Sequence, residues 1–135
     1  MQLIVWALLI ITALIGVGVN VIKKFAVGGI QINIQNAFQL STWIGLLTNP
    51  VAISSLIVSL GAWGLSLWAF SLEDANKVVA VTLGLAIPAL FLNILLNMKF
   101  FSETLSSNQI IGLGILVASM VLGVAGVYMA GGGLA

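Results

Sequence analysis

The sequence contains no cysteine and no histidine. These absences exclude disulfides, thiolate chemistry, zinc sites with Cys or His ligands, and haem held by histidine. Charged residues are also scarce, since four Lys and three acidic residues make up only 5% of the chain. Three carboxylates leave little for a metal site or for acid–base catalysis, so we expect neither a cofactor nor an enzyme. The formal net charge of +1 provides no basic field for nucleic acid, which is not an expected partner.

Apolar residues take the place of the missing charges. They make up 61% of the chain, and the mean hydropathy is +1.28, whereas a soluble domain carries about 25% charged residues. A soluble domain of this size cannot bury so much apolar surface, so the chain is expected in lipid. The 135 residues leave room for one compact unit, and we predict a single membrane domain over residues 1–135.

Long charge-free runs separate the charged residues. A membrane-spanning helix needs about 20 mostly apolar residues, and the chain has four such stretches. The short links between the second, third and fourth predict that these helices are antiparallel neighbours. The first stretch lacks the basic start of a signal peptide and is too long for one, so we expect it to be retained. The predicted fold is an all-α integral membrane protein, an antiparallel bundle of four transmembrane helices at residues 3–22, 51–72, 78–98 and 109–129.

Local signals mark the helix boundaries and one bend. Asn49 can cap the second span, and Pro50 suits the first position of that helix. Residues 106–108, Ser-Ser-Asn, offer caps for the fourth span. Pro88 falls near the middle of the third span, where it removes a backbone donor and is expected to kink the helix. Such a kink can act as a hinge or can only set the shape, and we favour the second interpretation.

Residues 26–47, between the first and second spans, are less regular. Gly28-Gly29 is expected to break the first helix. Beyond it, glutamines spaced four residues apart would form one stripe of a helix, but residues 30–34 also alternate as a strand does, so both conformations stay open. Because the segment has no charge, we predict that it lies at the membrane interface, with Trp43 at headgroup depth.

The lysines indicate an orientation. If the four helices alternate in direction, Lys23, Lys24 and Lys99 share one side of the membrane and Lys77 lies on the other. Three lysines against one favour the first side as cytoplasmic, which places both termini on the outer side of the cell membrane. The bias is small enough that insertion in both orientations also stays open.

Polar side chains inside the spans are candidates for a polar pocket. Asn93 and Asn97 are one helical turn apart and should share a face. They can bind a polar ligand or form hydrogen bonds to neighbouring helices, and we favour the hydrogen bonds. Tryptophans in membrane proteins more often anchor the chain at the interface than line a ligand site. The candidates for a pocket are Trp63, Ser66, Thr12, Asn20, Asn93 and Asn97.

Small residues run along the fourth span. Gly114 and Ala118 are four residues apart, as are Ser119 and Gly123, and such pairs let two membrane helices approach closely. The partner can be another helix of the same chain, a second copy or a different membrane subunit, and all three stay open. The candidate contact residues are Gly112, Gly114, Ala118, Ser119, Gly123 and Gly126.

Four stretches of the sequence are similar to motifs of a known protein family. Residues 60–72 hold a Gly, a Ser and a Trp ahead of a turn, and residues 100–106 read Phe-Phe-Ser-Glu-Thr-Leu-Ser. Residues 111–123 form a glycine-rich apolar run, and residues 21–25 place two lysines at the end of the first span. Together they resemble the drug/metabolite transporter superfamily, and in particular its four-helix small multidrug resistance proteins. The resemblance implies a four-helix unit paired with a copy of itself or with a relative.

One departure from that family bears on function. Small multidrug transporters have a Glu in the first helix about eight residues before the Lys, whereas residues 13–17 here are Ala-Leu-Ile-Gly-Val. Without a titratable group in mid-membrane, exchange of protons for a cationic drug is not expected. We therefore expect a non-catalytic accessory subunit that packs with membrane lipid and other membrane subunits. The alternative is a small dimeric transporter of a neutral or lipid-like substrate.

Overall fold

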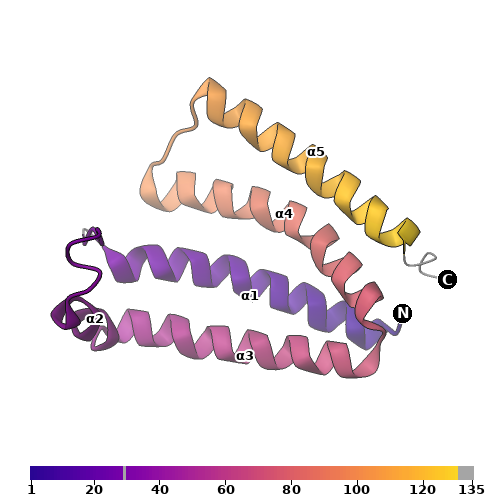
Figure 1. Ribbon diagram of the computed structural model, residues 1–135, viewed down its shortest axis with the longest axis horizontal. Coiled ribbons are helices and arrows are strands. Elements are labelled where there is room, and N and C mark those ends of the chain that lie inside the picture. The colour runs from indigo at the N-terminus through magenta and orange to yellow at the C-terminus, as the bar shows by residue number, and fades with distance from the viewer. Residues whose placement is uncertain (29, 131–135) are drawn as a thin grey trace.

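The apolar runs fold as helices. The computed structural model describes residues 1–28 and 30–130 and has no strand within them (Figure 1). Four of the helices are long and apolar enough to cross a membrane, as the sequence predicted for an integral membrane protein. The helices are α1 (Leu3–Val27), α2 (Leu40–Leu47), α3 (Pro50–Leu72), α4 (Ala75–Phe101) and α5 (Ser107–Ala130).

Two of the membrane helices are longer than the charge-free runs. α1 continues five residues past the predicted end at residue 22, and α4 extends the predicted range 78–98 by three residues at each end. The reason is that a lysine does not end a helix, because its long side chain can carry the charge toward water while the backbone stays helical. α1 ends where Gly28 has φ 57 and ψ −126, a backbone conformation that favours glycine.

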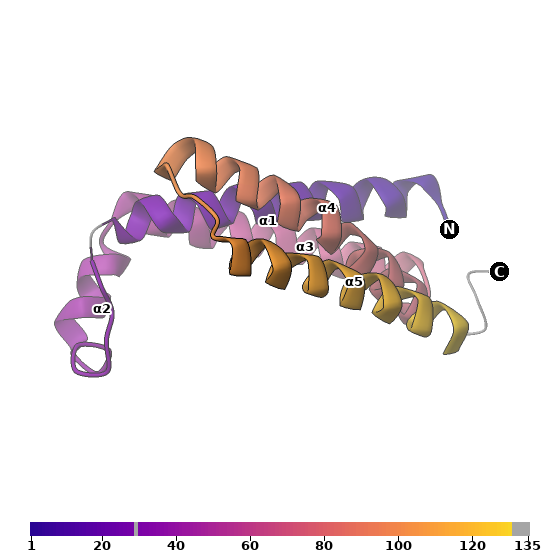
Figure 2. The same ribbon diagram turned by 90° about the horizontal axis from the view of Figure 1, so that it is seen from above.

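The segment between α1 and α3 is mostly an irregular loop. Neither the helical glutamine stripe nor a strand over residues 30–34 forms, and the only helix in the described part of the segment is α2. Asn33 and Asn36 explain this, since each backbone N–H donates to the other residue's Oδ1 at 2.7 and 2.9 Å. These bonds satisfy the backbone locally and so compete with regular structure. Figure 2 shows α2 projecting out of the layer of long helices.

The long helices form an open row rather than a closed bundle. α1 lies between α3 and α4, successive long helices run in opposite directions, and α5 lies on the far side of α4 (Figure 1). α1 packs against both α3 and α4, whereas α5 packs on α4. α5 therefore has most of its surface outside the fold.

A small apolar core fastens one end of the row. It lies between the start of α1, the end of α3 and the start of α4. Val5 and Val78 are its largest fully buried side chains. The core covers only the first seven residues of α1 and of α4 and the last four of α3, so the rest of these helices is held by fewer buried side chains. The core residues are Val5, Leu8, Leu9, Ala69, Val78 and Val81.

Side-chain caps confirm two of the predicted boundaries. Asn49 Oδ1 accepts from the Val51 N–H at 3.0 Å, and Pro50 takes the first helical position of α3. At the start of α5, Ser106 Oγ accepts from the Gln109 N–H at 3.3 Å. Gln109 Oε1 in turn accepts from the Ser106 N–H at 2.8 Å, so the pair forms a capping box.

Pro88 lies within a continuous α4. The helix passes through it without a break, and Figure 1 shows α4 bending along its middle. A proline at this position cannot donate to the carbonyl of Gly84, and its ring needs room beside that carbonyl. The bend separates the half of α4 that packs in the core from the half that carries Asn93.

We expect Asn49→Ala to destabilise the fold by about 2 kcal/mol. The change removes the cap of α3 and a second bond, in which Asn49 Nδ2 donates to the Ala26 carbonyl at 3.1 Å and ties α3 to the end of α1. Asn49→Ser keeps a capping oxygen and should cost about half as much. Denaturant titration of the detergent-solubilised protein measures both, and equal stability of all three proteins would contradict the account.

Candidate functional site

An open cavity of about 530 Å³ lies between α1, α3 and α4, with one residue from α5. We call it the central groove. Its lining repeats at helical spacing, for example Thr12, Gly16 and Asn20 on α1, so one face of each helix turns toward it. The lining residues are Thr12, Ala13, Gly16, Val17, Val19, Asn20, Lys23, Ser59, Ala62, Trp63, Ser66, Ala86, Ala89, Leu90, Asn93 and Met120.

The groove brings together most of the candidates for a polar pocket. Those that line it come from three different helices, so their meeting depends on how the helices pack. Asn97 does not line the groove. It lines a separate cavity of about 340 Å³ at the link between α4 and α5, beside Glu103 and Gln109. The candidates that the groove does bring together are Thr12, Asn20, Trp63, Ser66 and Asn93.

The polar groups of the groove differ in whether they already have a partner. Thr12 Oγ1 donates to the Leu8 carbonyl and Ser59 Oγ to the Ser55 carbonyl, each at 2.7 Å, so both hydroxyls are satisfied within their own helix. Asn93 Oδ1 is buried and has no hydrogen-bond partner within the described residues. A buried acceptor without a donor costs about 1–3 kcal/mol. One residue of the groove lining therefore has a buried oxygen that no described residue satisfies.

Lys23 is the charged residue in the lining of the groove. From the sequence, it was used for orientation and for the family resemblance, but its place in the groove was missed. Its spacing from Asn20 and Gly16, three and seven residues, was the signal that it shares their face of α1. The neighbouring Lys24 is absent from this lining, because it points from a different face of the helix. One end of the groove is therefore positively charged.

Most of the small residues of α5 face open space, whereas Gly112 is half-buried and lines the cavity beside Asn97. A Cβ placed on Gly112, Gly114, Gly123 or Gly126 would meet no described heavy atom within 4 Å outside the helix itself. No residue of α5 between Ser107 and Gly126 is buried. These glycines therefore create no close contact within the described chain.

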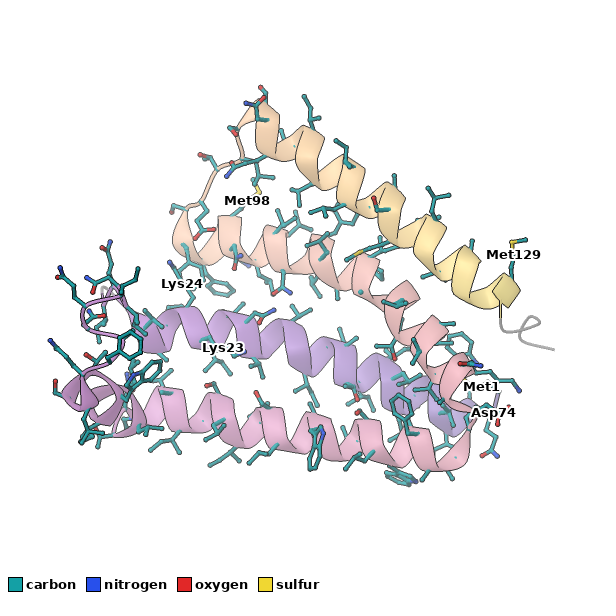
Figure 3. The ribbon with its side chains drawn as sticks, in the orientation of Figure 1. Met1, Lys23, Lys24, Asp74, Met98 and Met129 are labelled. Atoms are coloured by element: carbon teal, nitrogen blue, oxygen red, sulfur yellow. The ribbon has the colours of Figure 1, made fainter. Side chains whose placement is uncertain are left out.

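The charges at the two ends of the molecule differ. Figure 3 shows Lys23 and Lys24 at the end opposite to Met1 and Asp74. At the second end, Lys77 Nζ lies 3.3 Å from Glu73 Oε1 and 4.0 Å from Asp74 Oδ2. The acidic pair follows α3 directly and so lies at a helix end rather than in the middle of a span.

The ion pair shifts the titration of Glu73. Its side chain is 14% exposed. This burial raises the pKa of the carboxyl, but the hydrogen bond and the positive charge of Lys77 more than offset it, so the pKa lies below the ordinary value. The carboxylate is therefore held in its charged form at the end of α3.

We expect Asn93→Leu to stabilise the ligand-free protein by about 1 kcal/mol, because it removes the unsatisfied buried oxygen. Asn97→Leu, one turn away and outside the groove, is the matched control and should change stability less. Denaturant titration in detergent measures both. A clear loss of stability in Asn93→Leu would show that Asn93 joins helices through hydrogen bonds.

Because the pKa of Glu73 is lower in the folded protein, its contribution to stability is present at neutral pH. That contribution should be lost as the pH falls below about 4.3, the ordinary value for glutamate. Thermal unfolding of wild type and Glu73→Gln at several pH values tests this, with Glu103→Gln as the control outside these ion pairs. Wild type should lose more stability than Glu73→Gln between neutral and acidic pH, and parallel profiles would contradict the assignment.

No protein-family model, curated protein or solved structure matches this chain. The resemblance to the drug/metabolite transporter superfamily therefore rests on the short motifs alone and stays a prediction. The described residues also contain no group of three or more acidic, His or Cys side chains that could hold a metal ion. Any functional conclusion has to come from the geometry of the groove and of α5.

Proposed function

We propose that the chain is a non-catalytic integral membrane subunit with a drug/metabolite-transporter-like four-helix fold, and that it packs within a larger membrane protein complex. The surroundings of α5 carry this proposal. α5 packs on α4 and has no buried residue between Ser107 and Gly126, and its glycines meet no described atom of the same chain. A membrane helix gains stability from close backbone packing, and here that packing is left for another molecule.

The small residues of α5 fall on two flanks of the helix. The half-buried residues Leu113, Val117 and Met120 mark the side of α5 toward α4. At 3.6 residues per turn, Gly114 and Ala118 then lie on one flank, and Gly112, Ser119, Gly123 and Gly126 lie on the other. Each flank can accept one helix of a partner, either another subunit or a second copy of this chain.

In the membrane we place the end that carries Lys23, Lys24 and Lys99 on the cytoplasmic side, with both termini outside. The four long helices then cross the cell membrane as an antiparallel row (Figure 1). α2 projects away from their layer, which suits a helix lying in the interface (Figure 2). Its exposed Trp43 and Ile44 would enter the headgroup region.

The proposal is tested by native mass spectrometry of the protein after gentle extraction from its source membrane. The expected result is a species in which the chain is joined to other membrane proteins. Recovery only as a monomer, or only as a homodimer that transports a solute after reconstitution in liposomes, would overturn the subunit assignment. The same measurement reports copy number and bound lipid.

We expect Gly114→Leu to weaken association about tenfold or more while leaving insertion and helix content unchanged, because the larger side chain keeps the partner's backbone at a distance. Ile115→Leu, on the adjacent position with nearly the same volume, is the control. Co-purification of the extracted complex measures association, and circular dichroism checks the fold. Unchanged association of Gly114→Leu would remove this flank of α5 from the interface.

A second candidate function is transport of a neutral or lipid-like substrate by a homodimer. The central groove and the bend of α4 at Pro88 favour it, since a mostly apolar cavity with a few polar groups beside a bent helix provides both a site and a place to flex. Flux of candidate solutes into liposomes that contain only this chain tests the transporter. Absence of flux in reconstituted dimers would exclude the transporter, and the subunit assignment would remain.

A further inference from the structure

α2 stands at the level where two of the long helices meet the membrane border. It is joined to α3 by Thr48 and Asn49. Asn49 Nδ2 donates to the Ala26 carbonyl at 3.1 Å, so the end of α1 and the start of α3 lie together beside α2. Because α1 and α3 are long and apolar enough to cross a membrane, this level corresponds to the border between hydrocarbon and water. Figure 2 shows α2 crossing the direction of the long helices, as a helix in the membrane plane does.

Three different faces run along α2. Thr42 and Leu46, four residues apart, are half-buried and turn toward the rest of the chain. Ser41 and Gly45 lie on a second, polar face, and the third face is apolar and exposed. At 3.6 residues per turn, these faces lie about a third of a turn from one another. With the first face held by the protein, the other two can meet water and lipid at the same time. The apolar face consists of Leu40, Trp43, Ile44 and Leu47.

The loop before α2 extends this apolar surface. Phe38 is 88% exposed, and the carbonyl of the neighbouring Ala37 accepts from Trp43 Nε1 at 2.6 Å. This part of the loop therefore lies against the apolar face, and the indole N–H is satisfied within the chain. Exposed aromatic and aliphatic side chains at a membrane border gain stability by leaving water. We call the combined surface the α2 face, and its residues are Phe38, Leu40, Trp43, Ile44 and Leu47.

The α2 face has no charge beside it in the sequence. Residues 30–49 contain neither a basic nor an acidic side chain, and the polar face of α2 is built from small Ser and Gly. Attraction to anionic headgroups therefore cannot hold this segment, and its insertion depends on the burial of apolar surface. Bulky side chains enter where headgroups leave gaps, and opening a gap in tightly packed lipid costs free energy. Insertion should follow lipid packing more than lipid charge.

We propose that the α2 face inserts into the headgroup layer of the membrane that the chain spans, and that it prefers loosely packed lipid. The chain then responds to the packing of one leaflet through a segment that is fastened to the ends of α1 and α3. This inference rests on the interfacial position given to α2 in the proposed function. It is independent of the packing of α5, so its failure would leave the subunit assignment intact.

Because the chain has no cysteine, a label can be attached at one chosen position. Leu47→Cys on the α2 face and Ser41→Cys on the polar face are each labelled with a nitrobenzoxadiazole fluorophore, and the full chain is reconstituted in nanodiscs. All discs contain phosphatidylcholine with oleoyl chains and a trace of doxyl-labelled lipid, which quenches a label that it contacts. One set adds phosphatidylethanolamine, whose small headgroup leaves gaps, and another adds phosphatidylglycerol, which brings negative charge.

The label at Leu47 should be quenched, and phosphatidylethanolamine should raise this quenching about twofold, whereas phosphatidylglycerol should change it little. The label at Ser41 should be quenched little in every disc. With the label at Leu47, Leu40→Ser should lower quenching about twofold or more, because it places a hydroxyl in the α2 face. Gly45→Ser is the control and should leave quenching unchanged, since it adds a serine to the polar face, where a Cβ meets no described atom within 4 Å.

Several results would overturn the proposal. Equal quenching of the two labels would show that α2 inserts no particular face. Quenching that phosphatidylethanolamine leaves unchanged would remove the preference for loose packing, and a larger response to phosphatidylglycerol would mean that the lysines at this end attract the lipid. A label at Leu47 that is shielded from lipid, in discs whose native mass shows two copies of the chain, would mean that the second copy covers the α2 face.

Discussion

Hydrocarbon offers no hydrogen bond to a polar group, and the structure of this chain depends on that constraint. Helices satisfy their own backbone, which is why the apolar runs are helical from end to end. The hydroxyls of Thr12 and Ser59 meet the same demand by donating to carbonyls one turn earlier. Asn93 differs, because its buried Oδ1 has no partner among the described residues, although the residue lines the central groove. The constraint is therefore met along the helices and left unmet at this one buried oxygen of the described residues.

The sequence predicted the membrane helices well because length and hydropathy alone decide them. The predicted helix ends were too early, since the charge-free runs stop at Lys23 and Lys99 whereas α1 and α4 continue past them. Caps at Asn49 and Ser106 were predictable because each depends on residues within three positions along the chain. The loop between α1 and α2 was not predictable. Reciprocal hydrogen bonds between Asn33 and Asn36 form there in place of the helix and the strand that the sequence allowed.

The sequence predicted which residues could form the site, but it did not predict where in the fold they meet. Spacing along one helix relates Asn20 to Lys23 and Asn93 to Asn97, yet only the packing of α1 against α3 and α4 decides which of them meet. The packing places Asn93 and Asn97 in the linings of two different cavities, although they lie one turn apart on α4. It also leaves the glycines of α5 without neighbours, which no pattern in a single helix reveals.

The position of the apolar core has a mechanical consequence. Its six buried side chains join α1, α3 and α4 near the turn that contains Glu73, while the groove lies along the middle of the same helices. The far ends are fastened as well, because Asn49 ties α3 to Ala26 at the end of α1 and Phe25 packs on Phe101 at the end of α4. The width of the groove is therefore set by contacts at both ends of the helices, and a molecule can occupy its open side without parting either end.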